Sequence, residues 1–226
     1  MLTYIVFITD LLLATFMAEE NEQTPSRRLI TKGRLESLSD LIFGLALSIG
    51  ALTLIGTTPK NFGSLLVSIA YFAFTFLILI SVWRSYTGTM TNLKKVTPQV
   101  INLNTVLLFL VSIEPFLFNE FNATNIGTQN VSLLYALDLG GLFAIQSFLS
   151  SSVLVELSGP CELSEDFTHS RNMQAVAAAF FFISALPFFW TLAIPLSSSS
   201  SLPARFILWI IPLLLHPVER LFSLSR

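Results

Sequence analysis

The sequence predicts an all-α membrane protein with six transmembrane helices. Of its 226 residues, 53% are apolar and only 12% are charged, whereas soluble domains carry about 25% charged residues. The mean hydropathy is +0.73, and six apolar segments of about 20 residues, the length that crosses a bilayer, follow one another along the chain. With a net charge of −2, this composition excludes a disordered chain, a nucleic-acid-binding protein and an ordinary cytosolic enzyme.

The segment before the first span is expected to be cytoplasmic and comprises residues 1–33. Residues 1–17 are apolar but short for a span and hold Asp10 near their centre, which favours an interfacial helix over a span or a signal peptide. Residues 18–32 are polar, and we expect them to form an exposed tether. Residues 34–226 are then expected to form one six-helix transmembrane domain.

The six spans are predicted from apolar runs that end at polar or turn-forming residues. They cover, in order, about residues 35–55, 62–83, 100–118, 131–155, 173–196 and 203–221. The acidic stretch 156–172 is expected to be a solvated loop, although its Cys161 and His169 leave a metal site conceivable. The serine-rich stretch 197–201 is expected to be a flexible external loop.

The basic residues predict the orientation of the chain. Ten of the 12 Lys and Arg residues flank the same ends of the six spans, and only Lys60 and Arg205 lie on the other side. Cytoplasmic loops carry the excess of Lys and Arg. We therefore expect both termini in the cytoplasm, in a protein that most simply resides in the plasma membrane.

The first span has an apolar stripe and a polar residue on a different face. At about 100° per residue, the stripe lies within about 40° of Leu45, with Ser48 at its edge. Its members are Leu38, Leu41, Leu45, Ile49 and Leu52. Asp40 lies about 140° away. It either stabilises the helix start together with Ser39 or ligates an ion, and the first role is favoured because carboxylates in membrane spans usually find protein partners.

A short motif opens this span. The segment Arg34-Leu-Glu-Ser-Leu38-Ser39-Asp40 resembles the R-x-x-x-F-S-D signature of the transmembrane protein 175 family of potassium channels, with Leu38 in place of the usual Phe. Trp83-Arg-Ser-Tyr86, Leu103-Asn104, Phe109 and Pro115-Phe116 resemble the second and third helices of the family. The resemblance covers about residues 34–116, and the last three helices agree only in hydropathy and order.

The resemblance implies a homotetramer of six-helix subunits, as in the prokaryotic members with a single repeat, in which the first helix lines a potassium-permeable pore. The pore is then narrowed by Leu45, Ile49 and Leu52, and Ser48 offers a hydroxyl to a partly dehydrated cation. The resemblance also implies an internal polar network that fixes the pore helix, formed by Arg34, Ser39, Asp40, Tyr86 and Asn104. No carbonyl filter of the T-V-G-Y-G type occurs in the sequence. A channel that is gated by dewetting of an apolar constriction does not need such a filter.

Three further polar residues lie in or near the spans. Glu114 and Asp138 are interpreted either as groups that concentrate cations at a vestibule or as partners of a neighbour such as Arg205. His216 precedes Pro217 near the end of the last span and is interpreted as structural.

Three other functional classes compete with a channel. The sequence has no catalytic motif of the known hydrolases, metalloproteases or nucleotide-binding enzymes, and its single cysteine excludes a disulfide framework. We therefore expect no enzyme activity, no cofactor and no metal beyond permeant K⁺. A secondary transporter of a small cation or solute is the alternative to a channel, although the first three spans share no obvious pattern with the last three. A structural subunit that conducts no ions is a further alternative.

Overall fold

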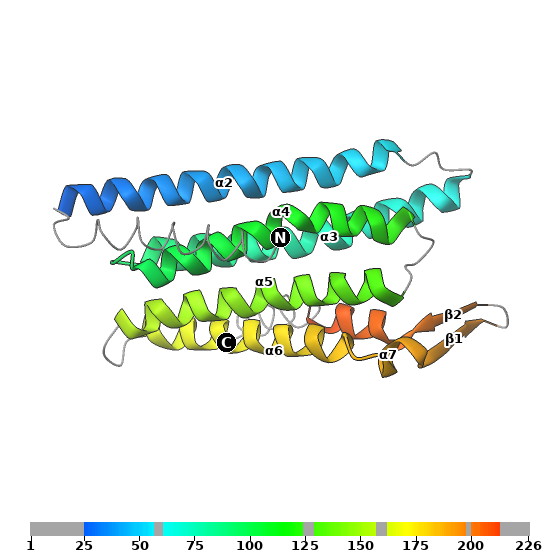
Figure 1. The fold of residues 1–226 in the computed structure, drawn as a ribbon. Helices are drawn as coiled ribbons and strands as arrows, with labels where there is room; N and C mark the ends of the chain where they lie inside the picture. The colour runs from blue at the N-terminus through cyan, green and yellow to red at the C-terminus, as the bar shows by residue number, and fades with distance from the viewer. Residues whose placement is uncertain (1–24, 57–60, 124–128, 157–161, 198–199, 213–226) are drawn as a thin grey trace, which may run out of the picture.

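The structure is a computed structural model that describes residues 25–56, 61–123, 129–156, 162–197 and 200–212. Five long helices lie side by side (Figure 1): α2 (Pro25–Gly56), α3 (Phe62–Asn92), α4 (Pro98–Ala123), α5 (Gln129–Glu156) and α6 (Glu162–Ser184). They are followed by the short helix α7 (Phe188–Thr191), by strands β1 (Ala193–Ser197) and β2 (Ser200–Pro203), and by helical residues 204–212. Helix α2 lies at one edge of the bundle, against α3 and α4.

Within the described residues, four helices are long and apolar enough to cross a membrane. They are the segments Lys32–Leu52, Phe62–Asn92, Pro98–Glu120 and Gln129–Val155. They contain most of each of the first four predicted spans. The chain is therefore a helical membrane protein.

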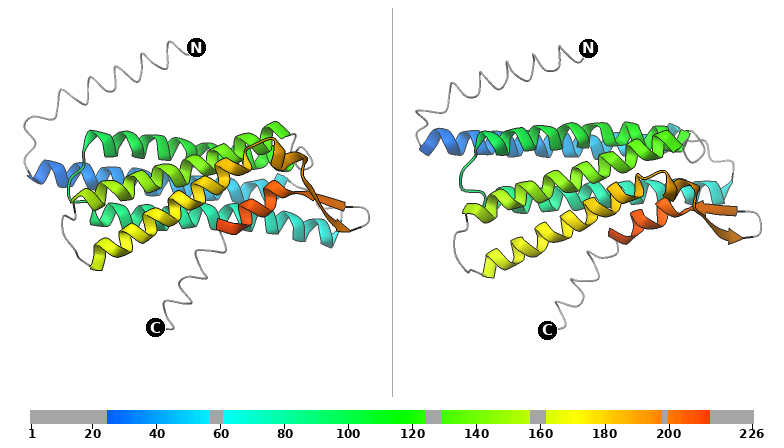
Figure 2. Two further views of the ribbon diagram at one scale, coloured as in Figure 1. Left: turned by 90° about the horizontal axis from the view of Figure 1, so that it is seen from below. Right: turned by 60° about the horizontal axis from the view of Figure 1, so that its bottom comes forward.

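The fifth predicted span, residues 173–196, does not form one continuous helix. Helix α6 begins upstream, at Glu162, and ends at Ser184. The helix stops there because Pro187 has no amide N–H and its ring disfavours a helical conformation at the residue before it. Residues 193–197 and 200–203 instead form an antiparallel pair of strands, β1 with β2, and this hairpin projects from the end of the bundle (Figure 2). Apart from this hairpin, the described elements are helices, in agreement with the predicted all-α class.

Three predicted non-helical segments also differ from the structure. The expected tether is helical from Pro25 onward, in agreement with the preference of proline for the first turn of a helix, and residues 1–24 lie outside the described part. Of the expected loop 156–172, only residues 157–161, also undescribed, fall between helices α5 and α6. The described part of the serine-rich stretch belongs to the hairpin. The sixth predicted span is helical at residues 204–212, and its remainder, with His216, is not described.

Helix α5 packs closely against its neighbours at two adjacent glycines. A Cβ atom added to Gly140 would lie 2.9 Å from the ring of Phe182 on α6, and one added to Gly141 would lie 2.9 Å from Leu110 Cδ1 on α4. Small residues allow helices in membranes to approach closely. These two positions therefore set the spacing of α4, α5 and α6.

Replacing Gly141 with alanine is expected to destabilise the bundle by about 1–3 kcal/mol, because the added methyl group overpacks the α4–α5 contact. Thermal unfolding in detergent measures the loss. Gly88→Ala on α3 is the matched control, since its added Cβ meets nothing within 4 Å. Equal melting temperatures for the two variants would contradict the close packing.

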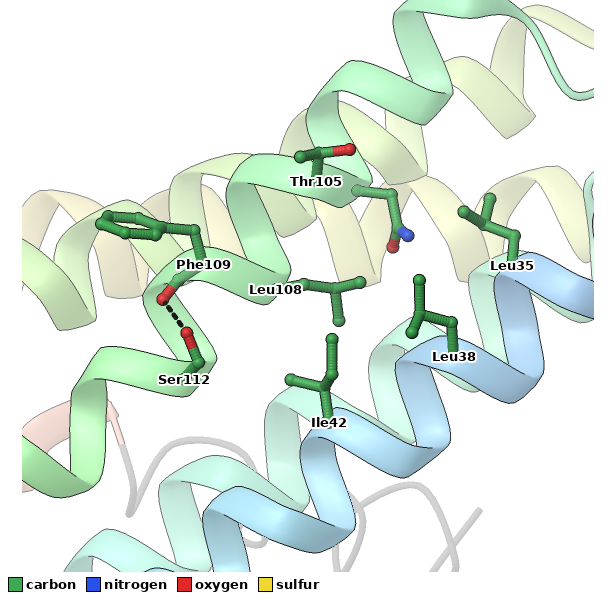
Figure 3. A pocket seen from close by; sticks show the side chains of 8 residues that line it. Leu35, Leu38, Ile42, Thr105, Leu108, Phe109 and Ser112 are labelled. Atoms are coloured by element: carbon green, nitrogen blue, oxygen red, sulfur yellow. Dashed lines mark hydrogen bonds between the residues drawn. The ribbon is translucent and has the colours of Figure 1, made fainter. Parts of the chain in front are cut away.

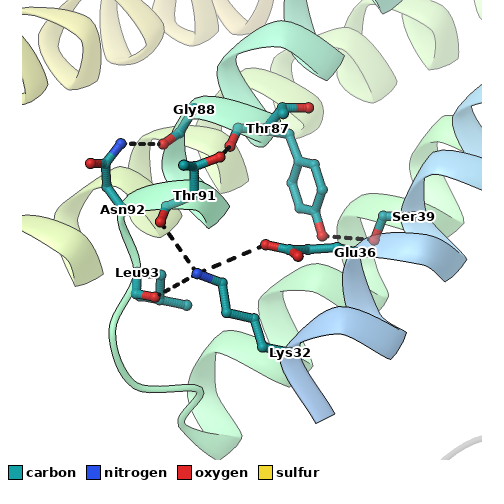
Figure 4. Close-up of polar contacts among 9 residues, drawn as sticks. Lys32, Glu36, Ser39, Thr87, Gly88, Thr91, Asn92 and Leu93 are labelled. Atoms are coloured by element: carbon teal, nitrogen blue, oxygen red, sulfur yellow. Dashed lines mark hydrogen bonds and ion pairs between the residues drawn. The ribbon is translucent and has the colours of Figure 1, made fainter. Parts of the chain in front are cut away.

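Two basic side chains satisfy the carbonyl groups at helix ends. Lys32 Nζ of α2 donates to Leu93 O at 2.9 Å and to Thr91 O at 3.3 Å, and it lies 3.9 Å from Glu36 Oε1 (Figure 4). These carbonyls terminate α3, where the helix dipole favours a cation. The contact holds the beginning of α2 beside the end of α3.

Arg205 plays the corresponding role at the end of α6 and is fully buried. Its guanidinium donates to Ser184 O at 2.7 Å, Ala185 O at 3.2 Å and Leu186 O at 3.3 Å. It also donates to Ser132 Oγ of α5 at 2.5 Å and lies 5.5 Å from the centroid of the Trp190 ring. Arg205 therefore joins the hairpin and residues 204–212 to the bundle, and it does not pair with Glu114 or Asp138 as had been considered from the sequence.

Candidate functional site

Helix α2 presents two faces of different character. Its buried face contains Ser39, Phe43, Ala46 and Gly50, spaced by four, three and four residues, which is the spacing of one side of a helix. The Phe43 ring lies 5.9 Å from the ring of Tyr86 on α3. This face fixes α2 against its own subunit.

The other face of α2 is apolar and exposed within the part of the chain that the structure describes. Leu45, Ile49 and Leu52 are 57%, 42% and 60% exposed, and Leu38 and Leu41 belong to the same exposed stripe. Ser48 is exposed as well, and its hydroxyl donates to Gly44 O at 2.8 Å. A hydroxyl that donates within its own helix keeps its oxygen free to accept, so Ser48 presents an oxygen among apolar side chains.

A buried polar cluster anchors α2 to α3 and α4. Ser39 Oγ donates to Leu35 O at 2.8 Å, lies 2.7 Å from Tyr86 Oη and accepts from Asn104 Nδ2 at 3.3 Å. Because the only hydroxyl hydrogen of Ser39 is directed to its own helix, Tyr86 is the donor to Ser39. The cluster therefore fixes the rotation of α2 about its axis.

The remaining residues of the predicted network lie apart from this cluster. Asp40 is exposed, and its Oδ1 accepts from Trp83 Nε1 at 2.9 Å. Arg34 is also exposed. The structure thus brings together Ser39, Tyr86 and Asn104, but it places Asp40 against α3 separately. The spacing of Trp83 and Tyr86, three residues apart on one face of α3, was a signal for this second contact.

Replacing Asp40 with alanine is expected to destabilise the α2–α3 contact by about 1 kcal/mol, the typical net value of one hydrogen bond. Trp83→Phe removes the same bond from the other side, so the effects of the two substitutions should not add in a double-mutant cycle. Thermal unfolding of the four proteins measures the coupling. An Asp40→Asn protein with native stability and an altered permeability ratio would instead place Asp40 on the ion pathway.

An open pocket of about 310 Å³ lies between α2 and α4. Figure 3 shows Leu35, Leu38 and Ile42 facing α4 across it. On α4 it is lined by Asn104, Thr105, Leu108, Phe109 and Ser112. Leu38, the position at which the opening motif departs from its usual Phe, therefore borders unfilled space. Within the described residues, no group of three or more His, Cys, Asp or Glu side chains is placed to hold a metal ion.

Three comparisons relate the chain to known proteins. Residues 34–115 match the model of the family described as endosomal/lysosomal potassium channel TMEM175. A potassium channel of Chryseobacterium sp. (strain P1-3) is 26% identical over 165 residues, which are 71% of this chain and 85% of the relative.

A solved structure has the same fold. It is the crystal structure of a lysosomal potassium-selective channel TMEM175 homolog from Chamaesiphon minutus, with a TM-score of 0.52 and 18% identity. The match covers 69% of this chain and 88% of that one. The matched family model begins at Arg34, where the opening motif begins, and it includes the anchor residues Ser39, Tyr86 and Asn104. The motif, the relative and the fold agree, and all three relate this chain to the TMEM175 family of potassium channels.

Proposed function

We propose that this protein is a potassium-permeable cation channel in which α2 of each of four identical subunits lines the pore. The observation that carries the proposal is the exposed apolar stripe on a helix whose opposite face is firmly anchored. The matched family model describes potassium channels, and the named relative is a potassium channel. Both support the same function. One pore helix per subunit cannot enclose a pathway, so a ring of subunits is needed.

The stripe supplies the constriction. Rings of Leu45, Ile49 and Leu52 offer no hydrogen bonds, and such rings stop ions by dewetting unless they are wide enough to hold water. Ser48 lies between two of these rings and supplies an acceptor oxygen to a cation that has lost part of its hydration shell. We assign the preference for K⁺ to Ser48 and Ile49, because a larger, weakly hydrated ion loses water more easily.

The membrane arrangement completes the proposal. Each subunit has six transmembrane helices, with both termini in the cytoplasm of a plasma-membrane protein. The partners are three further copies of the chain, the bilayer and K⁺ itself, with no cofactor. The bias of the basic residues supports this orientation.

Recording from purified protein in planar bilayers under bi-ionic K⁺/Na⁺ conditions tests the function. We expect single-channel steps with a reversal potential displaced in favour of K⁺. Flux that saturates and requires a coupling ion, without unitary steps, would favour a transporter and overturn the proposal. The mass of the protein in nanodiscs tests the assembly, and a stable monomer would contradict the tetramer.

A further inference from the structure

A buried carboxyl group ends a chain of hydrogen bonds in the interior of the subunit, away from the α2 stripe. Glu114 on α4 is fully buried, and its Oε1 accepts from Tyr135 Oη of α5 at 3.0 Å. Tyr135 Oη lies 3.0 Å from Thr75 Oγ1 of α3. Because the Tyr135 hydrogen is directed to Glu114, Thr75 is the donor to Tyr135. The two hydrogen bonds, from Thr75 to Tyr135 and from Tyr135 to Glu114, therefore both run towards Glu114.

A second buried carboxyl group lies on the helix that carries Tyr135. Asp138 follows Tyr135 by three residues, so the two side chains lie on one face of α5, a turn apart. Asp138 is 5% exposed, and it is close enough to interact electrostatically with Glu114 and with Tyr135. Within the described residues, Glu114 Oε2 and both oxygens of Asp138 have no hydrogen-bond partner.

Among the residues that the structure describes, the groups facing this pair from the surrounding elements supply no positive charge. Helix α3 contributes Thr75, and residues 204–212 contribute Trp209, whose ring lies 5.3 Å from that of Tyr135. The ring of Phe118 lies 6.4 Å from Tyr135. The nearby Arg205 directs its guanidinium to Ser132 and to backbone carbonyls, and the charged residues of α6 lie in its first half, from Glu162 to Arg171.

Two ionised carboxylates side by side in such surroundings are too costly to persist. We propose that Glu114 and Asp138 form a proton-binding site inside each subunit, in which the pair holds one proton between its two carboxyl groups. One bound proton leaves the pair with a single negative charge, which Tyr135 stabilises through its hydrogen bond to Glu114 Oε1. A proton needs only these acceptors, whereas an alkali ion requires a shell of several oxygens.

The site couples proton binding to the packing of three helices. Binding takes one proton from water and forms one O–H bond. Release of the proton leaves two negative charges, on Glu114 and Asp138, between α3, α4 and α5. Because the folded pair binds this proton more tightly than the separated carboxyls of the unfolded chain, stability is fully present at low pH and is lost as the pH rises. No residue of the α2 stripe takes part, so the inference does not depend on the proposed channel activity.

Infrared spectroscopy and thermal unfolding of the full-length protein in nanodiscs test the site. We expect the wild-type spectrum at neutral pH to show the C=O band of a protonated carboxylic acid, and Asp138→Asn to lose it. The melting temperature of the wild type should fall between about pH 5 and about pH 9, with a slope near one proton, and that of Asp138→Asn should vary much less. The asparagine amide reproduces the donor of the protonated acid, so this variant should fold.

Glu120→Gln is the matched control, because it removes another acid of α4 near the end of that helix and should keep both the band and the pH slope. Glu114→Gln provides a second folded variant, since its amide oxygen still accepts from Tyr135, and it too should lose the slope. A wild-type protein without the band would overturn the proposal. So would a stability that depends on K⁺ or Na⁺, relative to an organic cation at fixed pH, in the wild type but not in Asp138→Asn, because a metal ion would then occupy the site.

Discussion

Leu45→Asn is expected to increase the cation current of the reconstituted protein severalfold while leaving its yield unchanged. Leu45 lies at the centre of the exposed stripe of α2, where the proposed pore is narrowed by apolar rings. An amide at each position of the ring binds water and keeps the constriction wet, so ions meet a smaller barrier. The preference for K⁺ should weaken as well, because a wetter ring strips less water from a passing ion. Bi-ionic recordings measure both effects.

Leu77→Asn is the matched control for this experiment. Leu77 is 52% exposed, close to the 57% of Leu45, but it lies on α3, outside the proposed pore. The same substitution there should leave the conductance unchanged. If Leu45 instead packs against another part of the assembly, Leu45→Asn buries an unpaired amide and lowers the yield with no gain of current. The two arrangements thus predict opposite results for one variant.

Arg205→Ala is expected to lower the free energy of unfolding by about 3 kcal/mol or more, the largest loss of stability that we predict for a single residue. The substitution leaves the carbonyls of Ser184, Ala185 and Leu186 without their donor. It also removes the contact with Ser132 on α5. Thermal unfolding and limited proteolysis near the hairpin measure the effect.

Arg205→Lys separates the charge from the shape of the side chain. Lysine keeps the positive charge but lacks the planar fork that reaches several acceptors at once. We expect it to recover only part of the stability lost in Arg205→Ala. Full recovery by lysine would mean that the charge alone, acting on the end of α6, accounts for the role of Arg205.

The α2 helix shows how much the sequence alone determines. The 3.6-residue period separates Leu45, Ile49 and Leu52 from Ser39 without any tertiary information, and the structure places the first group on the exposed face and Ser39 in the core. The opening motif likewise indicated the resemblance to the TMEM175 family, whose model matches residues 34–115. Local periodicity and a continuous motif are sufficient here because both are properties of one helix.

The structure of the second half of the chain depends on contacts between residues that are distant in the sequence. Hydropathy extended the fifth span to residue 196, but the helix ends at Ser184, and Arg205, 21 residues further on, satisfies its last carbonyls. The partner of Asp40 was likewise found only in the fold, on Trp83.

The sequence by itself therefore determined the membrane class, the first four helices and the two faces of α2. Only the tertiary structure decided which polar groups are satisfied by which partners. It joined Ser39 to Tyr86 and Asn104 and placed Arg205 at the end of α6. It also left both oxygens of Asp138 without a hydrogen-bond partner among the described residues. The physical reason is that hydropathy and helical period depend on neighbours along the chain, whereas a buried hydrogen bond depends on which helices approach one another and at what rotation.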